Sequence, residues 1–127
     1  MKQIQIELDN LKDSFNRIEE QCSDFDANLM YKVMFISEEI ITNLARHADF
    51  QARTPDVILS LETTHNLLLT FKDNAKKFNM LEYPDPNIEE DVQVRELGGL
   101  GIFLTKKYAK KIEYLYEDGY NILRIEL

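Results

Sequence analysis

The sequence is poor in cysteine, glycine and proline, and it contains no long apolar run. Its 127 residues include one cysteine, four glycines and three prolines. The single cysteine, Cys22, has no second cysteine in the chain with which to form a disulfide. No segment approaches the roughly 18 consecutive apolar residues of a membrane-spanning helix. We therefore expect neither an internal disulfide nor a spanning helix.

Positive charge is also scarce. Lys and Arg number 15 against 23 Asp and Glu, which gives a net charge of −8. Such a balance does not suit a surface that neutralises a phosphate backbone or an anionic bilayer. The start of the chain, from Met1 to Leu8, also lacks the basic and apolar regions of a secretory signal. We expect a cytoplasmic protein that binds neither nucleic acid nor membrane.

The composition is that of one folded domain. Hydrophobic residues make up 44% of the chain and charged residues 30%. A chain of this length buries about two-thirds of the surface that it exposes when unfolded. No internal repeat or low-complexity segment is visible, so we predict a single domain over residues 1–127.

Two segments early in the chain have the periodicity of amphipathic helices. The first starts near Leu8, has Asp9 available as its N-cap, and reaches Cys22 with apolar residues at steps of three and four. The second runs from about Ala27 to Ala48. It has two adjacent apolar ribbons, which predict a deeply packed helix.

Strand patterns occur before and after these helices. Residues 4–8 alternate polar and apolar, and the runs 57–63 and 67–72 flank a turn. The inward-facing residues expected in this hairpin are Val57, Leu59, Leu61, Leu67, Leu69 and Phe71. A second hairpin, 112–117 with 120–127, turns at Asp118-Gly119, a pair that favours a type I′ turn. The order predicts an α+β two-layer sandwich with a mixed, mostly antiparallel sheet and helices on one face.

Three of the four glycines lie close together, at Gly98, Gly99 and Gly101. They fall where a long acidic loop, Asn79 to Leu97, meets a predicted helix from about Leu100 to Lys111. A glycine-rich backbone that opens a helix lets N–H groups converge on an anion, which makes this segment a candidate phosphate site. A hinge or a close backbone contact is the alternative for the glycines taken alone. Four lysines toward the other end of this helix are expected to form a solvated face: Lys106, Lys107, Lys110 and Lys111.

A polar row lies on the second helix. Glu39, Asn43 and His47 are spaced by four, so their side chains stack along one edge of the apolar stripe. A carboxylate and an amide one turn apart suit a base and a cation ligand. An ordinary polar flank is the simpler interpretation, and Glu38 is a competing carboxylate.

An acidic residue also follows the apolar strand 67–71. Asp73 stands at the strand end, where a carboxylate facing a cleft accepts a hydrogen bond from an exocyclic amine, and Phe78 supplies an apolar wall. The alternative role for Asp73 is a turn cap. One cysteine and two separated histidines do not make a zinc site.

These three elements together resemble the GHKL ATP-binding superfamily. Residues 37–48 (SEEIITNLARHA) resemble its N box, residues 73–79 (DNAKKFN) its first glycine box, and residues 96–104 (ELGGLGIFL) its second. The short lid and the segment from Glu39 to His47 look most like bacterial anti-sigma factor serine/threonine kinases. The resemblance covers essentially the whole chain.

The resemblance implies roles for individual residues. Glu39 is similar to the family's general base, Asn43 to its magnesium ligand, and Asp73 to the acid that reads the adenine amine. Residues 79–97 correspond to the ATP lid, and Arg17 to a partner-binding arginine. The implied cofactor-binding set is Asn43, Asp73, Ala75, Phe78, Leu97, Gly98, Gly99, Leu100, Gly101 and Ile102.

The resemblance also implies cofactors and partners. These are ATP and Mg²⁺, a sigma factor, an anti-sigma antagonist with a Ser or Thr acceptor, and a second copy of the chain. Ala75 departs from the family pattern, which has Gly there. If its φ is positive, the β-carbon costs on the order of 1 kcal/mol, or about fivefold in affinity. Two alternatives follow, a nucleotide-dependent binding module without catalysis and a partner-binding domain without nucleotide.

Overall fold

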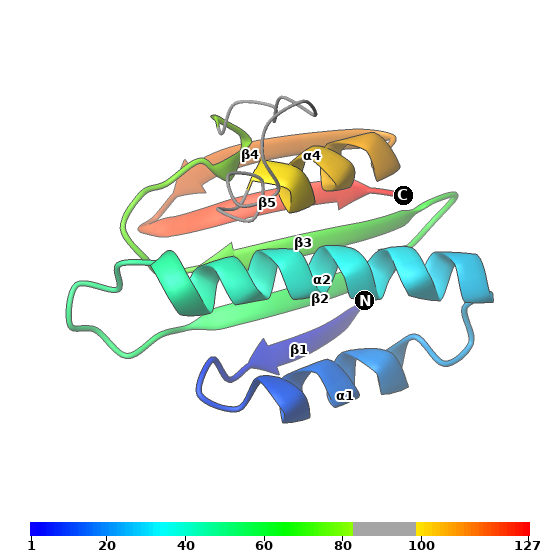
Figure 1. The fold of residues 1–127 in the computed structure, drawn as a ribbon, viewed down its shortest axis with the longest axis horizontal. Coiled ribbons are helices and arrows are strands. Elements are labelled where there is room, and N and C mark those ends of the chain that lie inside the picture. Colours follow the sequence, from blue (N-terminus) through cyan, green and yellow to red (C-terminus); the bar gives the residue numbers. More distant parts are fainter. Residues whose placement is uncertain (83–98) are drawn as a thin grey trace.

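The computed structural model describes residues 1–82 and 99–127, which form one sheet and a layer of helices. The strands are β1 (Lys2–Ile6), β2 (Val57–Thr63), β3 (Leu67–Asp73), β4 (Lys111–Glu117) and β5 (Tyr120–Glu126). Their spatial order is β1-β2-β3-β5-β4, and all neighbouring pairs are antiparallel. Helices α1 (Leu11–Gln21), α2 (Ala27–His47) and α4 (Gly99–Tyr108) lie on one face of the sheet (Figure 1). The predicted α+β two-layer fold is confirmed, with an antiparallel sheet among the described strands.

The inner face of the sheet carries the core. The six inward residues predicted for the first hairpin are all buried, and Leu59 and Phe71 are cross-strand partners. The inner face of β5 continues this layer with Leu123 and Ile125. Alternate residues of β2 and β3 are only partly buried because the opposite face carries no described helix.

Helix α2 lies across the centre of the sheet and supplies much of the core. It begins after Asp26, whose carboxylate accepts a hydrogen bond from the Leu29 N–H at 2.8 Å. Ile36, Ile40 and Leu44 recur at steps of four and are all buried. The predicted helix, 27–48, is therefore confirmed to within one residue.

The N-terminal boundaries differ from the prediction. β1 ends at Ile6, and α1 begins at Leu11 rather than near Leu8. The cap is Asn10 and not Asp9, because the Asn10 carbonyl oxygen Oδ1 accepts from the Asp13 N–H. Between strand and helix, the Ser14 hydroxyl bonds the backbone of Glu7, which holds residues 7–10 as a turn.

The last helix is shorter than predicted. α4 ends at Tyr108, and the Lys110 N–H already donates to the Glu126 carbonyl at 2.7 Å. Lys111 begins β4, so the expected row of four lysines on one helix is wrong. Only Lys106 and Lys107 lie in the last turn of α4, where cations favour the helix dipole.

The start of the predicted irregular loop is also more regular than expected. Residues Met80–Glu82 form a single 3₁₀ turn, η1, which follows the Asn79 side chain capping the Leu81 N–H at 2.9 Å. The lid residues that follow, including the acidic residues Asp85, Glu89, Glu90 and Asp91, lie outside the described residues.

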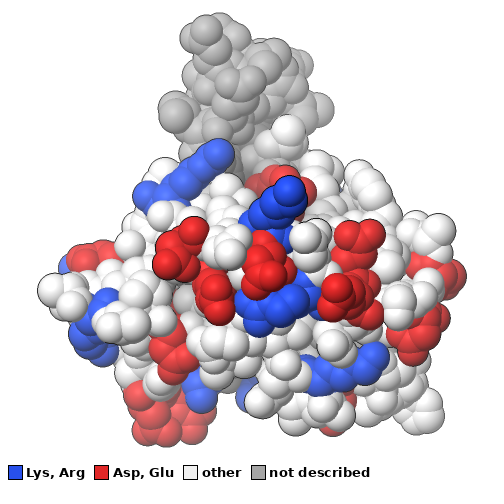
Figure 2. All heavy atoms as spheres, turned by 90° about the horizontal axis from the view of Figure 1, so that it is seen from below, with Lys and Arg blue, Asp and Glu red and all other residues white. Residues whose placement is uncertain are grey.

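Charges of both signs are mixed over the edge formed by α1 and β1 (Figure 2). Arg17 illustrates this mixing, because its guanidinium contacts Asp13 at 3.1 Å and Glu7 at 3.9 Å. No helix in the described ranges is long and apolar enough to cross a membrane.

The second hairpin turns as predicted. Asp118 and Gly119 have φ values of 54° and 82°, the positive angles of a type I′ turn. A β-carbon added at Gly119 would meet no atom within 4 Å, so its only cost is the backbone conformation.

We therefore expect Gly119→Ala to lower the free energy of unfolding by about 1 kcal/mol, since an L side chain disfavours positive φ. Urea unfolding measures this change. Asp118→Asn is the matched control, because Asn tolerates the left-handed region, and it should unfold like the wild type. An unchanged urea midpoint for Gly119→Ala would contradict the type I′ turn at Asp118-Gly119.

Candidate functional site

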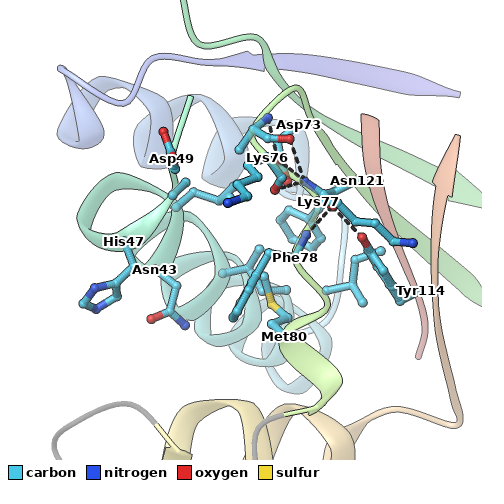
Figure 3. A pocket seen from close by; sticks show the side chains of 16 residues that line it. Asn43, His47, Asp49, Asp73, Lys76, Lys77, Phe78, Met80, Tyr114 and Asn121 are labelled. Carbon is cyan, nitrogen blue, oxygen red and sulfur yellow. Dashed lines mark hydrogen bonds between the residues drawn. The ribbon is translucent and has the colours of Figure 1, made fainter. Parts of the chain in front are cut away.

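A cavity of about 390 Å³ opens between the C-terminal half of α2 and the ends of β3 and β5 (Figure 3). This volume is in the range of small-molecule sites. Its lining residues come from α2, β3, the segments that follow these two elements, and the two last strands. They are Ile40, Asn43, Leu44, His47, Ala48, Asp49, Phe71, Asp73, Ala75, Lys76, Lys77, Phe78, Met80, Tyr114, Asn121 and Leu123.

Asp73 and Asn121 form the polar end of this cavity. They are cross-strand partners on the inner face of the sheet, and only 5% and 6% of their surfaces are exposed. The Asn121 Nδ2 group donates to Asp73 Oδ1 at 2.9 Å, and the Ala75 N–H donates to the same oxygen at 3.1 Å. One carboxylate oxygen is therefore committed to the protein.

The other oxygen of Asp73 is available to a ligand. Asp73 Oδ2 accepts no hydrogen bond from any described residue, and the side chain lines the cavity. Burial raises the pKa of this carboxyl, while hydrogen bonds from Asn121 and the Ala75 N–H act in the opposite direction. An ionised Asp73 presents a single buried acceptor, which suits an exocyclic amine.

Asn121 also holds the segment that follows β3. Its Nδ2 group lies 3.2 Å from the carbonyl oxygens of Ala75 and Lys76, and its Oδ1 accepts from the Phe78 N–H at 3.0 Å. The Tyr114 hydroxyl donates to the same Oδ1 at 2.5 Å. One buried amide therefore sets the path of the backbone along the cavity wall.

A second link joins the cavity walls. The Lys76 N–H donates to the Asp49 carbonyl at 2.7 Å, and Arg53 donates to the Asn74 carbonyl at 2.7 Å. These bonds connect the segment after α2 to the segment after β3. The two segments are therefore held together at this wall of the cavity.

Ala75 does not have the strained backbone that its place in the glycine box suggested. Its φ is not positive, and the described non-glycine residues with positive φ are Gln51, Ala52 and Asp118. The alanine is 3% exposed, and its N–H bonds Asp73. Because its φ is not positive, the β-carbon of Ala75 carries no conformational penalty.

Asn43 carries an unsatisfied amide. Its Nδ2 atom is buried and has no hydrogen-bond partner among the described residues, although the residue lines the cavity. His47 lines the same wall one turn further along α2 (Figure 3). An unpaired buried donor costs about 1–3 kcal/mol, so a ligand with acceptor oxygens would remove a penalty at this position.

Glu39 lies one turn before Asn43 and packs against α4 instead of lining the cavity. A β-carbon added at Gly101 would lie 1.9 Å from Glu39 Oε2 and 2.2 Å from its carboxyl carbon. A side chain at position 101 would therefore displace the Glu39 carboxylate. The predicted base and the predicted phosphate segment are in direct contact.

The surroundings of Glu39 favour its protonated form. Burial raises the pKa of this carboxyl, neighbouring Glu38 raises it further, and Arg46 lowers it. A carboxylate with a raised pKa is a stronger base than an exposed one.

The other predicted residues are distributed as follows. Phe78 lines the cavity and is 54% exposed, whereas the Ile102 side chain is buried in the core. Leu100 is partly exposed in the first turn of α4, which begins at Gly99. Of the described residues, none in α4 lines the cavity, and Leu97 and Gly98 lie outside the described residues.

Asn121 and Tyr114 were missed by sequence reasoning. The signal for Asn121 was its phase, because it shares the inward positions of β5 with Leu123 and Ile125. A polar residue on the apolar phase of a strand indicates a buried hydrogen-bond network. Tyr114 has no comparable local signal.

Residues 5–127 match the family described as the histidine kinase-like ATPase domain. None of the curated proteins matches the chain. The match covers nearly the whole chain and includes both cavity walls. A domain of this kind implies ATP binding.

The contact between Glu39 and Gly101 predicts that variants at the two positions are coupled. In the wild type, Gly101→Ala displaces the Glu39 side chain, and a strained side-chain rotamer costs on the order of 1 kcal/mol, which offsets the gain of Ala over Gly in a helix. In a Glu39→Ala background, the same change should stabilise by up to about 1 kcal/mol, because Ala favours helix over Gly. Urea unfolding of the four proteins measures both effects, and an equal effect in both backgrounds would contradict the contact.

Asp73→Asn should change the pH dependence of stability. A carboxyl whose native pKa is raised destabilises the fold increasingly as pH rises above its unfolded pKa of about 3.9. The amide retains an acceptor for Asn121 and Ala75, so the variant should gain stability relative to the wild type as pH rises from 4.

Asp56→Asn is the matched control with the opposite sign. Hydrogen bonds from Tyr120 and Gln5 lower the pKa of Asp56. Its contribution is therefore present above the unfolded pKa and is lost as pH falls through the native value. Thermal unfolding between pH 3 and 8 gives the Tm of both variants and of the wild type as a function of pH. If the Tm of Asp73→Asn followed that of the wild type in parallel, the raised pKa of Asp73 would be contradicted.

Proposed function

The chain belongs to the histidine kinase-like ATPase family, and from this we propose that it is an ATP-dependent protein serine/threonine kinase of the anti-sigma type. It binds a sigma factor in one state and phosphorylates an anti-sigma antagonist in another. Asp73 supports the nucleotide part of this proposal most directly, because its free Oδ2 is a buried acceptor at the end of an apolar cavity. The adenine amine of ATP is the donor that fits it.

In this proposal, Asn43 and the first residues of α4 contact the phosphate groups of ATP. The Nδ2 atom of Asn43 has no partner in the described part of the chain, and an amide offers a donor or an oxygen ligand. The described residues contain no cluster of three or more acidic, His or Cys ligands, so Mg²⁺ would be held by Asn43 together with the phosphates. Bound there, it would neutralise phosphate charge. The N–H groups of Gly99 and Leu100 favour an anion at the helix start.

Glu39 acts as the base in this proposal. It takes the proton from a partner's Ser or Thr hydroxyl as that oxygen bonds the γ-phosphorus, and the bond to the β-phosphate oxygen breaks to leave ADP. Positioning and electrostatics supply most of the rate enhancement for such a transfer. The contact between Glu39 and Gly101 supports this role, because it holds the carboxylate beside the proposed phosphate segment.

The partner surfaces are proposed on the α1 side. Arg17 is partly exposed, and Asp13 and Glu7 orient its guanidinium. It binds a partner protein in this scheme, and the chain works as a cytoplasmic homodimer.

One observation favours a second candidate function. Glu39 does not line the described cavity, so a module that captures partners in a nucleotide-dependent way without catalysis fits as well. Transfer by the wild type separates the two functions.

The test is incubation with ATP, Mg²⁺ and an anti-sigma antagonist that carries a Ser or Thr acceptor, read by the mass of the phosphorylated product. Glu39→Gln should lower transfer by about 10²- to 10⁴-fold while ADP affinity stays within about threefold, because the amide keeps the shape and loses the base. Glu113→Gln is the matched control, since Glu113 is exposed on β4 and should leave transfer unchanged.

The outcomes separate the candidates. Undiminished transfer by Glu39→Gln would remove Glu39 as the base. Nucleotide binding by the wild type without any transfer would favour the binding module.

A further inference from the structure

Asn121 has one possible amide orientation. Its Oδ1 faces two donors, the Phe78 N–H and the Tyr114 hydroxyl, and its Nδ2 faces three acceptors on Asp73, Ala75 and Lys76. Exchanging the two ends would place donors against donors and acceptors against acceptors. The amide is therefore held by five contacts and presents Nδ2 to Asp73.

This orientation determines what Asp73 offers to the cavity. Asp73 Oδ1 already accepts two N–H groups, so a proton on that oxygen would compete with both bonds and weaken them. The carboxylate cannot turn without breaking them either. Only Oδ2 faces a ligand, and it does so as an acceptor whenever Asp73 is ionised.

We propose that Asn121 is a positioning residue that makes the cavity select a 6-aminopurine nucleotide over a 6-oxopurine nucleotide. The inference rests on the nucleotide binding proposed above. An amine at position 6 donates to Asp73 Oδ2, whereas an oxo group places a second acceptor against it. A site built to accept one hydrogen bond rejects the analogue that lacks the donor, because its own buried group is left unpaired.

Asn121 exerts this effect without touching the base. All of its hydrogen-bonding groups are occupied by the protein, and only 6% of its surface is exposed. Without Asn121, Asp73 Oδ1 keeps only the bond from the Ala75 N–H, so the orientation of the carboxyl and the position of a proton on it are less restricted. The site would then discriminate less between the two kinds of purine.

The test compares ATP with ITP, which differ at position 6 of the base, by calorimetric titration in the presence of Mg²⁺. The wild type should bind ATP at least about thirtyfold more tightly than ITP. Asn121→Leu, which is similar in size and has no polar atoms, should reduce this ratio to within about threefold. A purely structural role would weaken both nucleotides alike and leave the ratio unchanged.

Asn66→Leu is the matched control. Asn66 also bridges elements through its amide, since Nδ2 donates to Glu126 at 2.7 Å and Oδ1 accepts from Lys110 at 2.6 Å. It follows β2, at the end of the sheet away from Asp73. This variant should lose stability and keep the wild-type ratio.

Asn121→Asp provides a second variant of almost the same shape. At pH 8 its carboxylate cannot donate to Asp73 Oδ1, so the ATP preference should fall as in Asn121→Leu. Lowering the pH to 6 favours a proton shared between the two carboxyls, which restores the donor, so the preference should rise again. The wild type measured over the same range accounts for the other titratable groups that line the cavity, which are His47, Asp49, Lys76, Lys77 and Tyr114.

Each outcome decides a different question. If the wild type binds neither nucleotide, the proposed ATP binding itself fails. If the wild type binds both nucleotides equally, or if Asn121→Leu and Asn121→Asp at pH 8 keep the full preference, ATP binding stands and the role of Asn121 is overturned.

Discussion

The pairing of Asp73 with Asn121 is the interaction on which the cavity depends. At the other positions of this layer, β3 and β5 pair buried apolar residues, such as Leu69 with Ile125. At this end they pair a carboxylate with an amide, which is costly in a core unless every group is bonded. The cost is offset through Ala75, Phe78 and Tyr114, and only one oxygen is left over. The apolar layer stops here, and a polar-ended cavity begins.

Helix α2 connects this polar end of the cavity to the proposed phosphate segment at the start of α4. Its buried face holds the helix on the sheet through Ile36, Ile40 and Leu44, and its flank carries Glu39 and Asn43 one turn apart. One helical turn, about 5.4 Å, separates these two positions. Because the buried face of the helix is packed on the sheet, the backbone at both positions is held in place. Asn43 lines the cavity and Glu39 contacts α4, so the same flank joins the nucleotide cavity to the proposed phosphate segment.

Local patterns were sufficient to predict most of the fold. The span of α2, the inward residues of the first hairpin and the turn at Asp118-Gly119 follow from short-range periodicity and backbone preference, and all are confirmed. The role of Asn121 was missed because β3 and β5 are neighbours only through a pairing of residues 48 apart in the chain. No local window contains that pair. Boundaries such as the end of α4 failed for the same reason, since pairing with Glu126 ends the helix.

The glycine positions show how a family pattern translates into physical requirements. A glycine is required either where φ is positive or where a β-carbon has no room. Gly119 meets the first condition, and at Gly101 a β-carbon would displace the Glu39 carboxylate, whereas the φ of Ala75 is not positive. The alanine therefore carries no conformational penalty. The catalytic proposal depends instead on Glu39 and on the glycine that makes room for it.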